Sequence, residues 1–205
     1  MAYVIGYSTP NFNLTIGNPI CVCMKIPWVV GKRAEQLSQL WEHGHTGYPS
    51  VDACMNQLRR DGWMHHLARH LVACFLTRGD LLVFWEIGRD VFVKYLLDAD
   101  WSVNNFSWHW LSCDTFFHQY FSSYDPSSFF KLSDPSGDYV REFVPVLRDF
   151  PDEFIYEPWR APKKLQKKLG CVIGKDYPKP MVDHSGASKE NMSKIKKVAM
   201  QYHHS

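Results

Sequence analysis

Segment 98–110 constrains the chain most, because it carries two carboxylates, two amides and three indoles within thirteen residues. Buried polar groups need hydrogen-bond partners, so these side chains require either a pocket or solvent. Asp98 and Asp100 can accept hydrogen bonds from ring N–H groups or sugar hydroxyls, and Asn104 can both donate and accept. Trp108 and Trp110 offer flat faces for stacking. The pattern fits a pocket for a large, flat, polar-edged molecule, or an acidic helix start followed by core aromatics, which is the more frequent case.

The composition is that of a domain with a sizeable core. The chain has 205 residues, of which 45% are hydrophobic and 15% aromatic, which suits one domain or part of one. No run of about 18 apolar residues and no signal-peptide pattern is present, so we expect no membrane span. The six cysteines lack zinc spacing, which predicts reduced, buried thiols of an intracellular protein.

Charge is distributed unevenly along the chain. Residues 160–200 contain 11 Lys and Arg against 3 Asp and Glu, whereas the residues outside that range carry 12 basic against 18 acidic side chains. A basic segment of this kind fits a surface that binds phosphates. It equally fits a solvated helix face, which charge runs usually are.

Helical periodicity predicts a succession of helices, and the sequence contains no internal repeats. Ser50 and Asp80 are placed to cap helices, and Pro145 is placed to bend one. The predicted helices span residues 32–42, 51–60, 63–76, 81–97, 101–124, 138–150, 163–169 and 187–202.

Two histidines of the predicted helix 63–76 stand out. His66 and His70 are four residues apart, so they share one face, and Arg69 reaches the same side. Such a pair can bind a metal, although the cation of Arg69 would repel it, or can pass a proton near neutral pH. His43 and His45 have no third ligand nearby, so we expect no metal site there.

The segment 98–110 and four further runs resemble the DNA photolyase/cryptochrome family, nearest to its (6-4) photolyases and animal-type cryptochromes. The family pattern runs Asp-x-Asp, Asn, Trp-x-Trp, as in residues 98–110. The other matching runs are GWMHHLARH at 62–70, CFLTRGDL at 74–81, GKDYPKPM at 174–181 and NPIC at 18–21. The match covers about residues 7–192, so the resemblance is specific.

The resemblance implies an all-α helical cluster that is the C-terminal part of an FAD-binding domain. Residues 1–205 would form a partial domain, with its core at about 7–192 and a basic tail at about 187–205. We expect the N-terminal α/β antenna domain, and the elements that cradle the flavin phosphates, to be absent. The implied cofactor is FAD, and the implied cofactor-binding residues are His66, Arg69, Asp98, Ala99, Asp100 and Asn104, with Arg69 and Asp98 forming a buried pair.

Further roles follow from the same resemblance. Trp108, Trp85 and Trp28 match an electron relay from the flavin to the surface, and Leu82 stands where some members carry a fourth tryptophan. Trp110 matches an indole that stacks on a flipped lesion. His66 and His70 match catalytic histidines that assist proton transfer in (6-4) photolyases. The chain departs from the family at Ser50, Phe106 and Phe130, where Trp, a small residue and Gly are usual, and a phenyl ring at Phe106 could crowd the cofactor.

The resemblance leaves three functions open. The first is blue-light-driven repair of (6-4) pyrimidine photoproducts in UV-damaged DNA by electron transfer from reduced FAD, a lyase activity. The second is a cryptochrome photoreceptor that binds clock or other signalling proteins. The third is an inactive, truncated paralogue.

Overall fold

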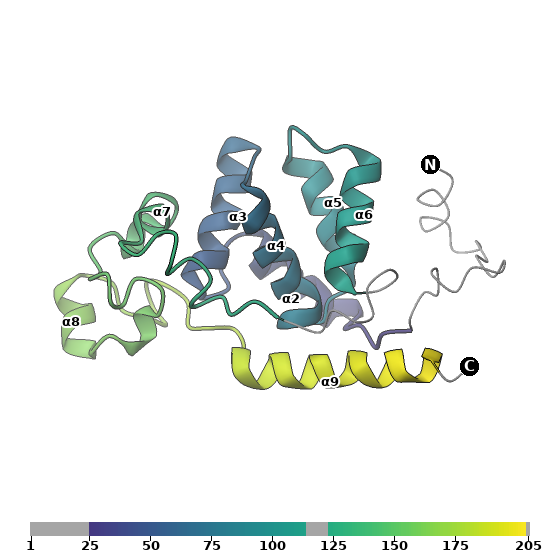
Figure 1. The fold of residues 1–205 in the computed structure, drawn as a ribbon. Coiled ribbons are helices and arrows are strands. Elements are labelled where there is room, and N and C mark those ends of the chain that lie inside the picture. The colour runs from purple at the N-terminus through teal and green to yellow at the C-terminus, as the bar shows by residue number, and fades with distance from the viewer. Residues whose placement is uncertain (1–24, 114–122, 204–205) are drawn as a thin grey trace.

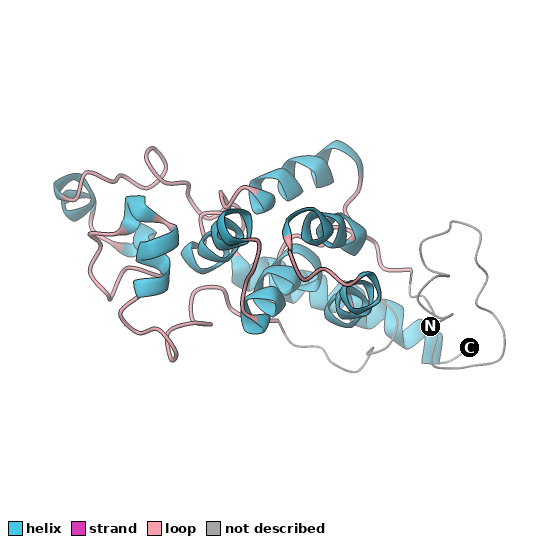
Figure 2. Cartoon of the chain, turned by 90° about the horizontal axis from the view of Figure 1, so that it is seen from above, coloured by secondary structure: helices cyan, strands magenta, loops and turns pink. Residues whose placement is uncertain are grey.

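The computed structural model describes residues 25–113 and 123–203, and these form a helical cluster (Figure 1). The described residues form helices but no β-strand (Figure 2), and their β-type pairing is limited to isolated bridges at Val29–Val83 and Ile173–Tyr177. The all-α prediction is therefore confirmed. The helices are α2 (Gly31–Glu42), α3 (Pro49–Asp61), α4 (His66–Cys74), α5 (Trp85–Tyr95), α6 (Trp101–Ser112), α7 (Asp138–Phe143), α8 (Lys163–Lys168) and α9 (His184–His203), with a π-helical turn at Phe75–Gly79 and 3₁₀ turns at Pro145–Leu147 and Pro158–Arg160. No described helix is long and apolar enough to cross a membrane.

The two predicted helix caps are wrong. α3 begins one residue before Ser50, at Pro49, which is favoured in a first helical turn. Ser50 is buried inside the helix, and its Oγ makes no hydrogen bond in the described structure. The polar residue that organises this helix start is Asp52, whose buried carboxylate accepts from the Thr46 N–H and hydroxyl, the Gly47 N–H and the Tyr177 hydroxyl.

Asp80 also differs from its expected role, because α5 begins at Trp85 rather than near residue 81. The Asp80 carboxylate is buried and lies 2.7 Å from Nδ1 of His184 in α9. Burial raises the pKa of Asp80 to about 6, against the opposing effect of His184. Asn191 of α9 donates to the Gly79 and Asp80 carbonyls at 3.1 Å. A long-range contact with α9 therefore takes the place of a local cap.

α5 and α6 pack together through a glycine. The Trp108 indole of α6 is 1% exposed and lies against Gly88 of α5, where an added Cβ would stand 2.1 Å from Cη2 of Trp108. Phe92, one turn further along α5, meets the same indole with ring centroids 5.0 Å apart. The predicted helix 101–124 ends at Ser112, since Cys113 has a left-handed backbone with φ of 59°. Residues 114–122 lie outside the described part.

Gly88→Ala should destabilise the chain, although alanine favours a helix by about 1 kcal/mol over glycine. The new methyl group would overlap the rigid six-membered ring of Trp108 and the side chain of Leu76, and overpacking of this kind costs about 1–3 kcal/mol. Urea unfolding measures the loss. In a double-mutant cycle, Trp108→Phe should relieve part of the cost because phenylalanine is shorter. Equal stability of Gly88→Ala and the unaltered chain would contradict this packing.

Candidate functional site

A cavity of about 410 Å³ opens between α4, the α5–α6 connection and α6. Its volume lies in the range of small-molecule sites. It brings together the residues predicted to bind the cofactor, although these come from segments about thirty residues apart. The lining residues are Trp63, Met64, His65, His66, Arg69, His70, Ala73, Phe92, Leu96, Asp98, Ala99, Asp100, Val103, Asn104, Ser107, Trp108 and Leu111.

Charged side chains form one rim of the cavity. Arg69 Nη2 donates to both oxygens of Asp98 at 3.1 and 2.9 Å, and its Nε donates to the Met64 carbonyl. The predicted pair thus forms, but it is not buried, since the Asp98 side chain is 52% exposed. Asp100 Oδ1 accepts from the Val103 N–H at 2.8 Å and caps α6. One oxygen of Asp100 is therefore occupied by the helix that it begins.

Asn104 lies deeper in the cavity wall and is 8% exposed. Its amide nitrogen donates to the backbone carbonyl of Arg89 in α5 at 3.2 Å. Because both helices hold this amide, its orientation is fixed before any ligand binds.

Histidines of α4 and the residue before it also line the cavity. The rings of His66 and His70 have centroids 6.1 Å apart, and His70 stacks on Tyr124. Burial, together with the charges of His66 and Arg78, lowers the pKa of His70, so this imidazole is neutral near pH 7. His65, which the sequence analysis did not single out, also lines the cavity and has its ring centroid 4.3 Å from that of His66. The adjacent histidine pair in the sequence was the available signal.

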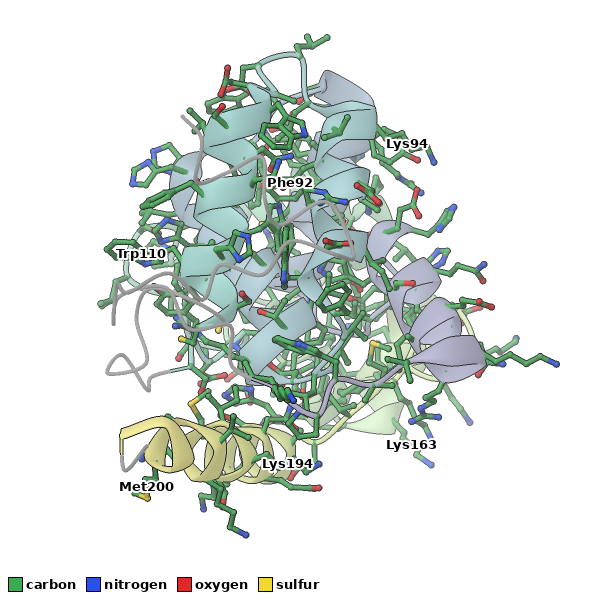
Figure 3. All side chains as sticks on the ribbon, turned by 90° about the vertical axis from the view of Figure 1, so that its right-hand side faces the viewer. Phe92, Lys94, Trp110, Lys163, Lys194 and Met200 are labelled. Atoms are coloured by element: carbon green, nitrogen blue, oxygen red, sulfur yellow. The ribbon has the colours of Figure 1, made fainter. Side chains whose placement is uncertain are left out.

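The four indoles with predicted roles differ in their position relative to the cavity. Trp108 forms part of the cavity wall, whereas Trp85, Trp28 and Trp110 do not line it. Trp28 reaches Trp85 through Phe84, with centroid separations of 6.0 and 5.8 Å. Trp85 contacts the buried ring of His109, the residue after Trp108, at 4.1 Å. Trp110 is 40% exposed at the edge of the cluster (Figure 3).

The departures from the family pattern leave the cavity clear. Phe106 is 44% exposed and has its ring 6.5 Å from that of Trp110, outside the cavity lining. Phe106 therefore does not narrow this cavity. Phe130 packs between Phe129 and Tyr139 at 5.1 and 5.6 Å, also away from the cavity. Neither ring narrows the space that a ligand would enter.

The basic C-terminal segment lies away from the cavity. α9 runs along the foot of the cluster in Figure 1, whereas the α5–α6 connection that carries Asp98 and Asp100 is at the top. Lys163 and Lys194 lie toward the α9 end in Figure 3. These lysines therefore do not surround the cavity. Within the described ranges no group of three His, Cys, Asp or Glu side chains could hold a metal ion, and Cys54, Cys74, Cys113 and Cys171 are buried thiols.

The cavity suits a flat heteroaromatic ring. Apolar walls come from Met64, Phe92, Leu96 and Trp108, while carboxylate oxygens stand at one rim. A flavin ring system complements these two features, because it has an apolar face and N–H groups at its edge. The residues present therefore fit the isoalloxazine part of FAD.

Comparisons with known proteins agree with this geometry. Residues 1–197 match the model of the FAD binding domain of DNA photolyase. A (6-4)DNA photolyase of Oryza sativa subsp. japonica is 58% identical over 188 residues, which are 92% of this chain and 33% of that protein. A Cryptochrome-1 of Erithacus rubecula is 53% identical over 97% of this chain and 31% of its own length.

Solved structures give the same result. A bacterial class III photolyase from Agrobacterium tumefaciens superposes with a TM-score of 0.77 at 36% identity, over 86% of this chain and 36% of that one. An archaeal photolyase from Sulfolobus tokodaii, solved with two FAD molecules, superposes with a TM-score of 0.73 at 29% identity, over 85% of this chain and 37% of that one. The chain thus spans about a third of the relatives that it matches. It belongs to the DNA photolyase/cryptochrome family, in the region that binds FAD.

Proposed function

We propose that the chain is part of a (6-4) photolyase that repairs (6-4) pyrimidine photoproducts in UV-damaged DNA under blue light, in the nucleus, the cytoplasm or both. The observation that carries this proposal is the shared cavity, where His66 and His70 stand beside Arg69, Asp98 and Asn104. A flavin site alone would not need a pair of histidines at its mouth, whereas rearrangement of a photoproduct requires a proton donor and a proton acceptor. The identity to a rice (6-4)DNA photolyase supports the same assignment.

Each side chain then has a definite task. When bound, reduced FAD supplies one electron on absorbing blue light. Asp98, held by Arg69, and Asp100 would hold the cofactor by accepting hydrogen bonds from it, together with Ala99 and Asn104 of the cavity lining. His66 donates a proton to the flipped lesion, and neutral His70 can take one up.

The tryptophans have separate tasks. Trp108, Trp85 and Trp28 would form the route by which electrons reach the cavity from the surface. Trp110, exposed on α6, stacks on the extruded base. The lysines of α8 and α9 are not among the residues that line the cavity.

A cryptochrome is the second candidate function. Several Cryptochrome-1 proteins are 53–54% identical over 97% of this chain, nearly as similar as the photolyases. In that case clock or other signalling proteins replace DNA as the partner. Repair of a damaged oligonucleotide under blue light separates the two, and a chain that binds no FAD and repairs nothing would be an inactive paralogue.

His66→Ala should lower the repair rate of the flavin-loaded protein about 100-fold or more, because one general acid typically contributes that factor. Absorbance of the bound flavin should be unchanged, since Arg69 and Asp98 remain. His43→Ala, in the distant turn after α2, serves as the matched control and should repair normally. Repair by His66→Ala at the unaltered rate would refute the role of His66.

Trp108→Phe should abolish photoreduction of oxidised bound flavin, because the indole in the cavity wall is the first electron donor of the relay. Trp101→Phe removes an exposed indole of the same helix outside the cavity and should have no effect. Flavin absorbance during blue illumination measures both. Normal photoreduction in Trp108→Phe would show that the relay is wrongly assigned.

A further inference from the structure

Trp41 of α2 is a buried neighbour of Trp108 that the relay does not include. Its indole is 0% exposed and meets the Trp108 indole edge to face, with centroids 6.3 Å apart and planes at 78°. Within the described residues no such ring contact joins Trp108 to Trp85, which reaches α6 through His109 and lies one turn from Gly88. Trp41 therefore has a ring contact with the first donor that Trp85 lacks in the described part of the chain.

Local electrostatics also distinguish the two indoles. The Trp41 N–H donates to the Val72 carbonyl at 3.0 Å, and the negative end of that dipole stabilises positive charge on the ring. The Trp85 N–H is buried and makes no hydrogen bond in the described part. The Arg89 guanidinium lies 5.2 Å from the Trp85 ring centroid, so an oxidised, cationic Trp85 would be repelled.

Carboxylates around Arg89 reduce this repulsion without removing it. Asp90 and Glu86 pair with the guanidinium at 2.8 and 3.6 Å, but Asp90 is 67% exposed and its charge is screened by water. Positive charge should therefore be more stable on Trp41 than on Trp85.

We propose that Trp41 is a second electron donor to Trp108, forming a branch beside the relay to Trp85. The inference rests on the proposed function, in which photoexcited oxidised flavin is the oxidant of Trp108. In the step itself Trp41 gives one electron to oxidised Trp108. Trp108 is reduced to the neutral indole, Trp41 is oxidised by one electron, and its proton stays on Nε1 in the hydrogen bond to Val72. Because Trp41 is fully buried, the branch stores the charge and returns it to Trp108.

The test compares Trp85→Phe with the double variant Trp85→Phe/Trp41→Phe by transient absorption after a blue flash, with FAD bound or with flavin mononucleotide dissolved as the photo-oxidant. The tryptophan radical should live about tenfold longer in the single variant, because only the single variant can move the positive charge from Trp108, at the cavity, to Trp41. Equal lifetimes would overturn the branch.

Two further measurements test the branch without a repair assay, and each compares several variants, so that one variant that fails to fold does not decide the result. In the flavin-free chain, Trp41→Phe and Trp108→Phe should each remove the same exciton couplet from the circular dichroism spectrum, while Trp85→Phe retains it. A couplet that survives Trp41→Phe would overturn the contact. Arg89→Met, which removes the cation beside Trp85, should make the radical lifetime of the otherwise unaltered chain insensitive to Trp41→Phe, and continued sensitivity would overturn the electrostatic argument.

Different results would refute the branch and the proposed repair function. A radical that still forms in Trp108→Phe would refute the relay and the branch together. Absence of repair, with the lifetimes as expected, would refute only the photolyase assignment.

Discussion

The close approach of the Trp108 indole to Gly88 is the contact on which the site depends. It sets the distance between α5 and α6, and only a glycine leaves room for the ring. With that distance fixed, the Asn104 amide reaches the Arg89 carbonyl of the facing helix. The same indole forms the cavity wall on one side and contacts Trp41 on another. One side chain therefore joins the core, the ligand cavity and the aromatic network.

Polar contacts between distant segments fix the frame around this core. The buried carboxylate of Asp52 joins the turn before α3 to Tyr177, and Asp80 joins the π-helical turn to His184 of α9. A buried carboxylate needs several donors to offset its desolvation, so these contacts specify how the C-terminal segment packs. They place α9 at the end of the cluster away from the cavity.

The sequence predicted the helical class and the faces of the helices well, because both depend on short-range periodicity. The four-residue spacing of His66 and His70 was enough to place them on one face, and both line the cavity. The resemblance to the family predicted that Arg69 and Asp98 pair. Neither the resemblance nor the residue spacing indicated that the pair is half-exposed. The caps expected at Ser50 and Asp80 failed because their surroundings come from residues about a hundred positions away or from a proline that starts the helix one residue earlier.

The central claim is that Asp98, oriented by Arg69, binds the flavin edge at this cavity. The most direct measurement is titration of the chain with FAD, followed by quenching of flavin fluorescence, for Asp98→Asn and for Asp90→Asn. Both aspartates pair with an arginine and are exposed, but only Asp98 lines the cavity. Asp98→Asn should bind FAD about tenfold more weakly or worse, since a charged hydrogen bond contributes about 1.5–3 kcal/mol, whereas Asp90→Asn should bind like the unaltered chain. Equal affinity of the two variants would contradict the account.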